Sequence, residues 1–137
     1  MIKERSCGAV VYKKEKNEYL FLLEKMKLGH ISLSKGHDEA NESEEETALR
    51  EIKEETNLEV DLDTGFRHVI SYSPYDGCMK DVVFFVARVK DNGKMIPQEC
   101  EVSGLVWKNF QEARELLTFD SDKQTLESAY NYLKAQH

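Results

Sequence analysis

The sequence predicts an α/β protein in which a mixed sheet is covered by helices. Three observations carry this prediction: apolar, β-branched runs of strand length, stretches of helical periodicity between and after them, and turn-forming residues at the junctions. Strands that alternate with helices along a chain are typical of this class. We expect residues 1–137 to form one domain around a single hydrophobic core.

The first strands are expected near the beginning of the chain. Residues 5–13 (RSCGAVVYK) are apolar and β-branched, and a charged turn follows them. Residues 19–24 (YLFLLE) then form the second arm of a hairpin or a nearby strand. Residues 29–35 are expected to be a loop with a short apolar piece at 31–33.

A helix is expected from Ser43 to about Thr56. Ser43 followed three residues later by Glu46 fits a capping box, and the acids of this first turn suit the positive end of the helix dipole. Residues four apart share a helix face. The residues expected to face the core are Ala48 and Ile52, with Leu49 beside them.

The second half of the chain is expected to contain strands at 66–72, 81–89 and 102–108 and helices at 111–117 and 120–136. Turns are indicated at 73–77 and 91–93. The stretch 81–89 (DVVFFVARV) is the most apolar, so we expect it to be a central strand. The apolar side chains of the last helix recur at helical spacing, at Leu126, Ala129, Tyr130 and Leu133.

The charge of the chain limits its partners. With 19 Lys and Arg against 26 Asp and Glu, the formal charge is −7, which argues against a stable nucleic-acid partner and against a polybasic membrane anchor. No apolar run has transmembrane length. The three cysteines have no CxxC spacing and no signal peptide precedes them, so we expect reduced thiols and a cytoplasmic location. The sequence does not indicate an oligomeric state.

Three acids near the end of the expected helix stand out. Glu51, Glu54 and Glu55 share one face, where Glu51 and Glu55 repel each other and the helix dipole disfavours negative charge. Helix stability does not call for this arrangement, but a hard divalent cation with oxygen ligands would. The alternative is a solvated acidic face in an acidic protein.

The surrounding stretch favours the metal site. Gly36, then Glu42 after five residues, then the run 50–58 (REIKEETNL) after seven more, resembles the Nudix hydrolase signature G-x5-E-x7-R-E-U-x-E-E-x-G-U, where U is aliphatic. Eight of its nine specified positions match. The departure is Asn57, where the pattern has Gly. Asn is the next residue type that tolerates the left-handed conformation, so we interpret Asn57 as a workable helix stop.

The resemblance implies an α/β/α sandwich with a loop–helix–loop motif. It also implies an enzyme that cleaves nucleoside-diphosphate-linked substrates with Mg²⁺ or Mn²⁺ and an attacking water. The implied metal ligands are Glu51, Glu54, Glu55 and the backbone carbonyl of Lys35, although some of the acids could hold the water instead. Arg50 would orient these carboxylates, or merely pair with Glu54 on the helix surface. Glu42 would tie the loop to the helix, and Gly36 would permit close backbone approach.

A finer resemblance concerns the substrate. Residues 34–37 (SKGH) are similar to the Pro-Lys-Gly-His of the asymmetrical diadenosine tetraphosphate hydrolases, with Ser34 in place of Pro. Residues 7–10 and 21–23 also look like the opening strands of that subgroup. The acid six residues before Trp107, which we expect in the core, matches a subgroup active-site Glu. Glu101 is therefore a candidate metal ligand or general base, with Glu99 as a neighbour that could be confused with it.

Several further residues are candidates for substrate contacts. Lys35, Lys80 and His37 could bind phosphate oxygens, and Tyr72 and Tyr75 could stack on adenine. The alternatives are a surface lysine at a strand end, a solvated loop histidine, and tyrosines used only for packing.

Three functions remain open at this point. The first is hydrolysis of a dinucleoside polyphosphate, with diadenosine tetraphosphate giving ATP and AMP. The second keeps this chemistry but acts on nucleoside triphosphates, RNA 5′ ends or sugar nucleotides. The third is a nucleotide-binding module without turnover. Because the motif acids and Arg50 are all present, we expect an enzyme.

Overall fold

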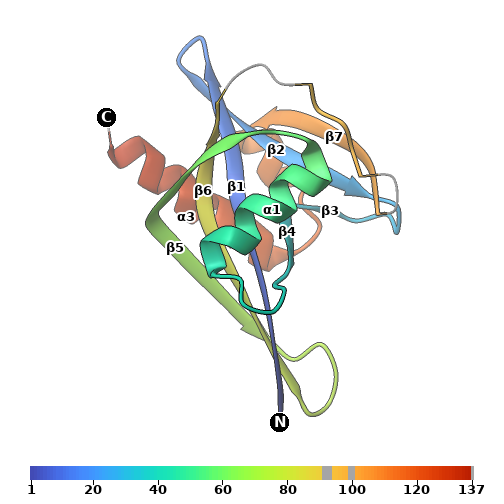
Figure 1. The fold of residues 1–137 in the computed structure, drawn as a ribbon. Helices are drawn as coiled ribbons and strands as arrows, with labels where there is room; N and C mark the ends of the chain where they lie inside the picture. The colour runs from blue at the N-terminus through green and yellow to red at the C-terminus, as the bar shows by residue number, and fades with distance from the viewer. Residues whose placement is uncertain (91–93, 99–100, 137) are drawn as a thin grey trace.

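A mixed sheet runs through the structure, with helices on both of its faces (Figure 1). The computed structural model describes residues 1–90, 94–98 and 101–136. The strands are β1 (Ile2–Glu15), β2 (Glu18–Met26), β3 (Ile31–Ser32), β4 (Ser34–His37), β5 (Val60–Tyr72), β6 (Cys78–Val89) and β7 (Val102–Asn109), and the helices are α1 (Glu44–Thr56), α2 (Phe110–Leu116) and α3 (Asp120–Ala135). The strand order is β3-β2-β1-β6-β5, with β4 paired to β1 and β7 paired to β2.

Strand β1 organises the sheet because it has partners along both edges. One edge pairs in parallel with β6, from Ile2 opposite Cys78 to Tyr12 opposite Arg88. The other edge pairs antiparallel, first with β4 and then with β2. A glycine permits the first of these contacts: a Cβ at Gly8 would lie 1.9 Å from the carbonyl oxygen of Ser34. This close pairing fixes the position of β4, which leads into the loop before α1.

The buried residues form two clusters, one on each face of the sheet, rather than the single core that we expected. Side chains alternate between the faces of a strand, so neighbouring residues of β1 enter different clusters. Val10 packs with residues of α2 and α3, whereas Ala9 and Val11 pack with residues of α1. Figure 1 shows α1 in front of the sheet and α3 behind it. The expected α/β/α sandwich is confirmed.

Helix α1 begins and ends as the sequence predicts. Ser43 is the N-cap of a complete capping box with Glu46, and Asn57 follows the last turn in the left-handed conformation, with φ of 65°. Ala48 and Ile52 are fully buried. The expectation for Leu49 was wrong, because this side chain is 41% exposed. One residue further along the helix turns the side chain about 100° away from the face of Ala48.

Most strands extend beyond the predicted limits. Strand β5 begins at Val60 instead of residue 66, and β6 begins at Cys78 instead of residue 81. Backbone pairing between the two strands explains this, since it also stabilises polar residues that lack strand propensity. The turn predicted at 91–93 lies outside the described residues. Within the described part of the chain, no helix combines the length and apolar character needed to cross a membrane.

Candidate active site

Arg50 lies at the centre of a hydrogen-bond network that joins the loop after β4 to α1. Its Nε and Nη2 atoms donate to the two carboxylate oxygens of Glu42, at 2.7 and 3.0 Å. Its Nη1 atom donates to Oε1 of Glu51 at 2.8 Å and to Oε1 of Glu54 at 3.1 Å. Nη2 also donates to the carbonyl oxygen of His37 at 2.9 Å. One guanidinium therefore fixes the loop and two of the predicted metal-binding acids relative to each other.

Glu42 has further partners within the same loop and helix. It accepts hydrogen bonds from the backbone N–H of Glu39 at 2.9 Å and from the Thr47 hydroxyl at 3.0 Å. The hydrogen bond from Arg50 is the main cause that lowers the pKa of Glu42 to about 2. The same contact raises the pKa of Arg50. The pair therefore stays ionised at neutral pH.

Glu55 differs from the other two acids because it faces the interior. It is 3% exposed, and its carboxyl group interacts directly with that of Glu24 from β2, which is 1% exposed. Burial, followed by the charge of Glu24, raises the pKa of Glu55. The Ser34 hydroxyl donates to Oε2 of Glu24 at 2.6 Å. Sequence reasoning missed Glu24, and the signal that could have revealed it is a charged residue at the end of an apolar strand run.

A polar cavity of about 250 Å³ lies over this acid pair. It brings together six predicted residues from distant parts of the chain: Lys35, Gly36, His37, Glu55, Lys80 and Glu101. The other lining residues are Ser6, Glu24, Met26, His30, Ser32 and Leu33. Glu51 and Glu54 do not line it. The Glu51 carboxyl lies against Gly36, and Arg50 donates hydrogen bonds to both acids and to the carbonyl oxygen of His37. Glu99 lies outside the described residues.

The basic side chains of this cavity lie close together. Lys80 Nζ is 3.4 Å from Nε2 of His37. Burial, and then the nearby charge of Lys35, lowers the pKa of Lys80. The predicted strand at 81–89 would leave Lys80 just ahead of it, whereas the structure places Lys80 within β6. A group of cations that raise each other's energy is suited to an anionic ligand.

An apolar cavity of about 300 Å³ adjoins the polar one and shares His30, Ser32 and Lys35 with it. Its remaining lining residues are Ile70, Tyr72, Val82, Phe84, Phe119, Ser121 and Asp122. Tyr72 was predicted, whereas Phe119 and Asp122 were missed, because residues so far apart in the chain show no common pattern. Tyr75 lines neither cavity and is 51% exposed in the turn after β5.

Asp122 is the one carboxylic acid among the described residues that line the apolar cavity. It is 4% exposed, and within the described part of the chain its carboxyl group has neither an ion pair nor a hydrogen bond. Burial raises its pKa to about 6. Its carboxyl oxygens are therefore acceptors that the protein leaves available beside an aromatic surface.

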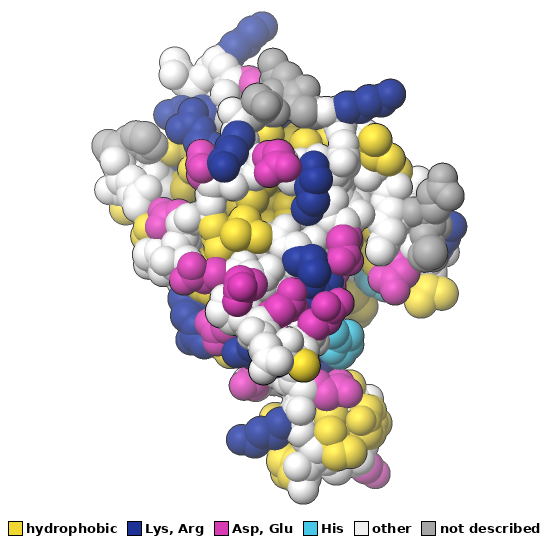
Figure 2. Space-filling model, in the orientation of Figure 1, with side chains coloured by type: hydrophobic (Ala, Val, Ile, Leu, Met, Phe, Trp, Pro, Cys, Tyr) yellow, Lys and Arg dark blue, Asp and Glu magenta, His cyan; other side chains and the backbone are white. Residues whose placement is uncertain are grey.

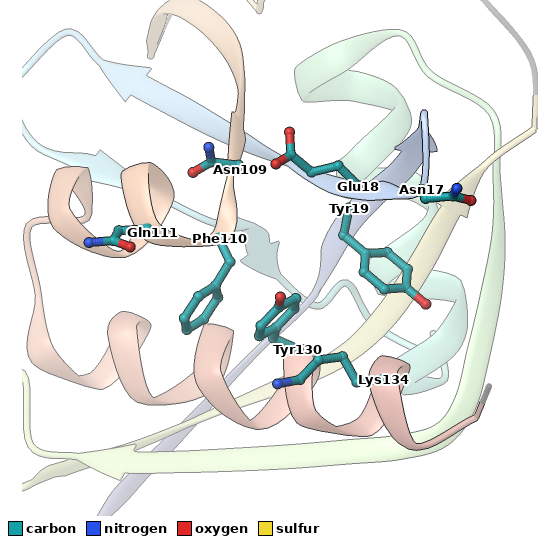
Figure 3. A pocket seen from close by; sticks show the side chains of 8 residues that line it. All are labelled: Asn17, Glu18, Tyr19, Asn109, Phe110, Gln111, Tyr130 and Lys134. Carbon is teal, nitrogen blue, oxygen red and sulfur yellow. The ribbon is translucent and has the colours of Figure 1, made fainter.

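A larger, more open cavity lies elsewhere, between the hairpin of β1 and β2 and the helices α2 and α3 (Figure 3). The rings of Phe110 and Tyr130 stack there at 4.2 Å between centroids, and Lys134 lies over Tyr130. None of the predicted site residues lines this cavity. We therefore take the two adjoining cavities, one lined by Glu55 of α1 and the other by Asp122 of α3, as the candidate site. Figure 2 shows acidic side chains with basic ones among them across the face that carries α1.

The comparison with known families agrees with this geometry. The NUDIX domain family matches residues 3–129 of the chain. The chain belongs to the Nudix family. The resemblance drawn from residues 36–58 is thereby confirmed over nearly the whole sequence.

Relatives of this Nudix chain include two mammalian proteins described as asymmetrical bis(5′-nucleosyl)-tetraphosphatase. The Mus musculus protein is 31% identical and the Rattus norvegicus protein 30% identical, each over 94% of this chain and 95% of its own length. Together these matches make the chain a hydrolase that acts on phosphoric anhydride bonds.

Two solved structures show the same fold at low sequence identity. A C. elegans Ap4A hydrolase binary complex superposes with a TM-score of 0.87 at 22% identity, covering 96% of this chain and 98% of that one. The NUDIX domain of Shewanella oneidensis NrtR, complexed with ADP ribose, superposes with a TM-score of 0.78 at 19% identity, covering 97% and 90%.

Nudix hydrolases generally use divalent metal ions, and the site has donors that suit one. Within residues 1–90, 94–98 and 101–136, no three His, Cys, Asp or Glu side chains are already arranged around a common point. However, Oε1 of Glu55 is buried without a hydrogen-bond partner among the described residues, next to a cavity that the acids Glu24, Glu55 and Glu101 line. Carboxylate oxygens are ligands that Mg²⁺ and Mn²⁺ prefer.

Proposed function

We propose that this Nudix hydrolase is a metal-dependent pyrophosphohydrolase that cleaves diadenosine tetraphosphate into ATP and AMP. The observation that carries the proposal is the junction of the two cavities at His30, Ser32 and Lys35. A charged compartment next to an aromatic one matches a substrate with a polyphosphate chain and a nucleobase. The names of the mammalian relatives support the choice of substrate.

The cation is Mg²⁺ or Mn²⁺ in this proposal. The residues that would hold it are Glu51, Glu54, Glu55, Glu101 and the backbone carbonyl of Lys35. When bound, the ion neutralises phosphate charge and lowers the pKa of a bound water. Arg50 positions Glu51 and Glu54 through its hydrogen bonds, Glu42 holds Arg50, and Asn57 ends the helix that carries the acids.

The polyphosphate chain of the substrate meets the basic side chains of the polar cavity. Lys35, Lys80 and His37 would each contact phosphate oxygens. Burial and mutual repulsion disfavour a charged Lys80 in the free protein, so an incoming anion relieves a cost that is already present. These contacts orient the anhydride bond for attack, which is the main protein contribution in phosphoryl transfer.

The reaction adds one water across one anhydride bond. The water oxygen bonds to phosphorus, the bond from that phosphorus to the bridging oxygen breaks, and the proton removed from the water ends on the products or on bulk solvent. Glu101 or Glu54 is the candidate to accept this proton, since both are exposed acids at the edge of the site.

The apolar cavity would hold one adenine. Tyr72 and Phe119 line it and offer aromatic faces for stacking. Tyr75 is further away and would contact the substrate only beyond this cavity. A cytoplasmic location is part of the proposal and is supported by Cys7 and Cys78, which are free and buried.

Asp122 favours a second candidate, which is hydrolysis of a guanine-type nucleoside triphosphate. An ionised carboxylate accepts hydrogen bonds from the adjacent N1–H and amino groups of guanine, whereas adenine presents one donor beside the acceptor N1. Asp122 lines the apolar cavity with no partner of its own among the described residues. This candidate keeps the metal chemistry and changes only the substrate.

Product analysis on a panel of substrates, with and without Mg²⁺, tests the proposal. The panel contains diadenosine tetraphosphate, ATP, 8-oxo-dGTP, ADP-ribose and a triphosphorylated RNA. We expect ATP and AMP from diadenosine tetraphosphate at a higher kcat/KM than for any other member, and no products after chelation with EDTA. Faster hydrolysis of 8-oxo-dGTP would favour the second candidate.

A variant of the motif separates catalysis from binding. We expect Glu54→Gln to retain nucleotide binding but lose most product release, because Glu54 is an exposed acid whose carboxylate Arg50 positions. Glu115→Gln makes the same chemical change at an exposed site on α2 and is the matched control. Tight binding by the wild type without metal-dependent release of any product would overturn the enzymatic proposal.

A further inference from the structure

The buried acids Glu24 and Glu55 lie against each other, and no described basic side chain pairs with either of them. Their carboxyl groups interact directly at 1% and 3% exposure. Neither forms an ion pair with a described basic side chain. Two ionised carboxylates in contact inside a protein are strongly unfavourable. The pair therefore requires either a shared proton or a cation.

The hydrogen bonds around the pair are incomplete in a way that indicates a cation. The Ser34 hydroxyl satisfies Oε2 of Glu24 at 2.6 Å. Oε1 of Glu55 is buried and has no hydrogen-bond partner in the described part of the chain. A buried, unpaired carboxylate oxygen is costly unless a ligand occupies the adjoining space. That space is the polar cavity, which both acids line.

The local fold holds Glu24 at this position with little freedom. It lies opposite Ser32 of β3 and Leu105 of β7, so strands pair with both edges of β2 at this residue. Ser34 supplies a side-chain donor that the proline of the subgroup pattern could not supply. A side chain that is restrained before binding loses little entropy when it coordinates an ion.

We propose that Glu24 is a further ligand of the divalent cation, acting with Glu55 and held in place by Ser34. This inference rests on the metal dependence in the proposed function. It adds a residue outside residues 36–58, contributed by β2, to the acids of α1. The site would then combine charged oxygens from two elements that pack against each other.

Mn²⁺ binding without substrate tests the inference directly. Electron paramagnetic resonance titration would give Kd for the wild type, Glu24→Gln and the surface control Glu115→Gln. We expect Glu24→Gln to raise Kd at least about tenfold, with the control within about twofold of wild type. Gln keeps the side-chain volume and still accepts from Ser34, so lost packing does not explain such a change.

Thermal melting without and with metal gives a second test. Glu24→Gln should not lower Tm in the metal-free protein but should weaken the stabilisation by metal. Without the cation, Glu24→Gln removes one of two buried acids that cannot both be ionised, so its Tm should equal or exceed that of the wild type. With saturating Mn²⁺, the increase in Tm should be smaller for Glu24→Gln than for the wild type. A pair that serves only the structure would show no such reversal.

Two outcomes would overturn the inference, and only the second would also overturn the metal-dependent function. A Kd for Glu24→Gln within about twofold of wild type would mean that the acids share a proton, and the metal-dependent function would stand. A wild type that binds no Mn²⁺ would overturn both. Should Glu24→Gln fail to fold, Glu24→Asp keeps the charge but withdraws the carboxylate by one methylene, and the same Kd criterion applies to it.

Discussion

Gly36 lies directly against the carboxyl group of Glu51. A Cβ placed at Gly36 would be 2.1 Å from both Cδ and Oε2 of Glu51, far inside contact distance. The backbone of Gly36 has no positive φ, so its role is close approach and not unusual conformation. The absence of a side chain at residue 36 thus lets the acid from α1 reach the strand that carries Lys35.

Gly36→Ala should therefore displace the Glu51 carboxylate and weaken catalysis. A displacement of about 1 Å at such a site lowers kcat/KM by about 100-fold. Steady-state kinetics on the best substrate of the panel would measure it. Gly104→Ala is the matched control, because a Cβ there meets only Cδ of Lys25 at 3.8 Å. Full activity in Gly36→Ala would show that Glu51 does not need its present position.

Arg50→Lys should lower kcat/KM even though the charge is kept. An ammonium cannot reproduce the guanidinium fork that bonds Glu42, Glu51 and Glu54 at once, so the acids lose their fixed positions. We expect a loss of about 100-fold or more. Arg67→Lys also breaks a two-pronged contact, with Glu44, but outside the cavities, so it should retain activity. Equal losses in both variants would argue for a general effect on α1.

Asp122→Asn should change how stability depends on pH. The folded pKa of Asp122 is about 6 against an ordinary value of 3.8, so the folded state binds more protons between these values. Stability from this group is therefore greatest below about pH 4, falls as pH rises to about 6, and then stays level. The full difference is of order 3 kcal/mol.

The comparison to make is urea unfolding of wild type and Asp122→Asn at pH 4.5 and pH 7.5. The variant should gain stability relative to wild type at the higher pH, because Asn carries no buried charge. Asp120→Asn, exposed in the same turn of α3, should show no such pH-dependent gain. An identical difference between wild type and Asp122→Asn at both pH values would contradict the raised pKa.

Asn57 allows a test of the helix stop without touching the chemistry. Asn57→Ala should lower the free energy of unfolding by about 1 to 2 kcal/mol, because Ala is strained at φ of 65°. It also loses the hydrogen bond from Nδ2 to the carbonyl of Lys94. Asn57→Gly relieves the strain but loses that bond, so it should stay within about 0.5 kcal/mol of wild type. Urea denaturation would measure both, and Mn²⁺ affinity should not change in either.

Local patterns in the sequence predicted those features that depend on neighbours along the chain. The capping box at Ser43, the helix stop at Asn57 and the burial of Ala48 and Ile52 follow from residues within a few turns of each other. The prediction that Leu49 faces the core was wrong, because its environment depends on which face of the helix meets the sheet. The predicted strand limits were wrong for a similar reason, since a partner strand stabilises residues that have little strand propensity of their own.

The sequence by itself determined the fold class, the family and the motif between Gly36 and Asn57, because fixed spacing on one helix fixes which groups can act together. Only the tertiary structure decided that Glu24 contacts Glu55 and that Asp122 enters the apolar cavity. Those residues come from β2 and α3, far from the motif in sequence. Their carboxylates acquire a role only when packing of the sheet and helices removes water around them, and no spacing along the chain records that burial.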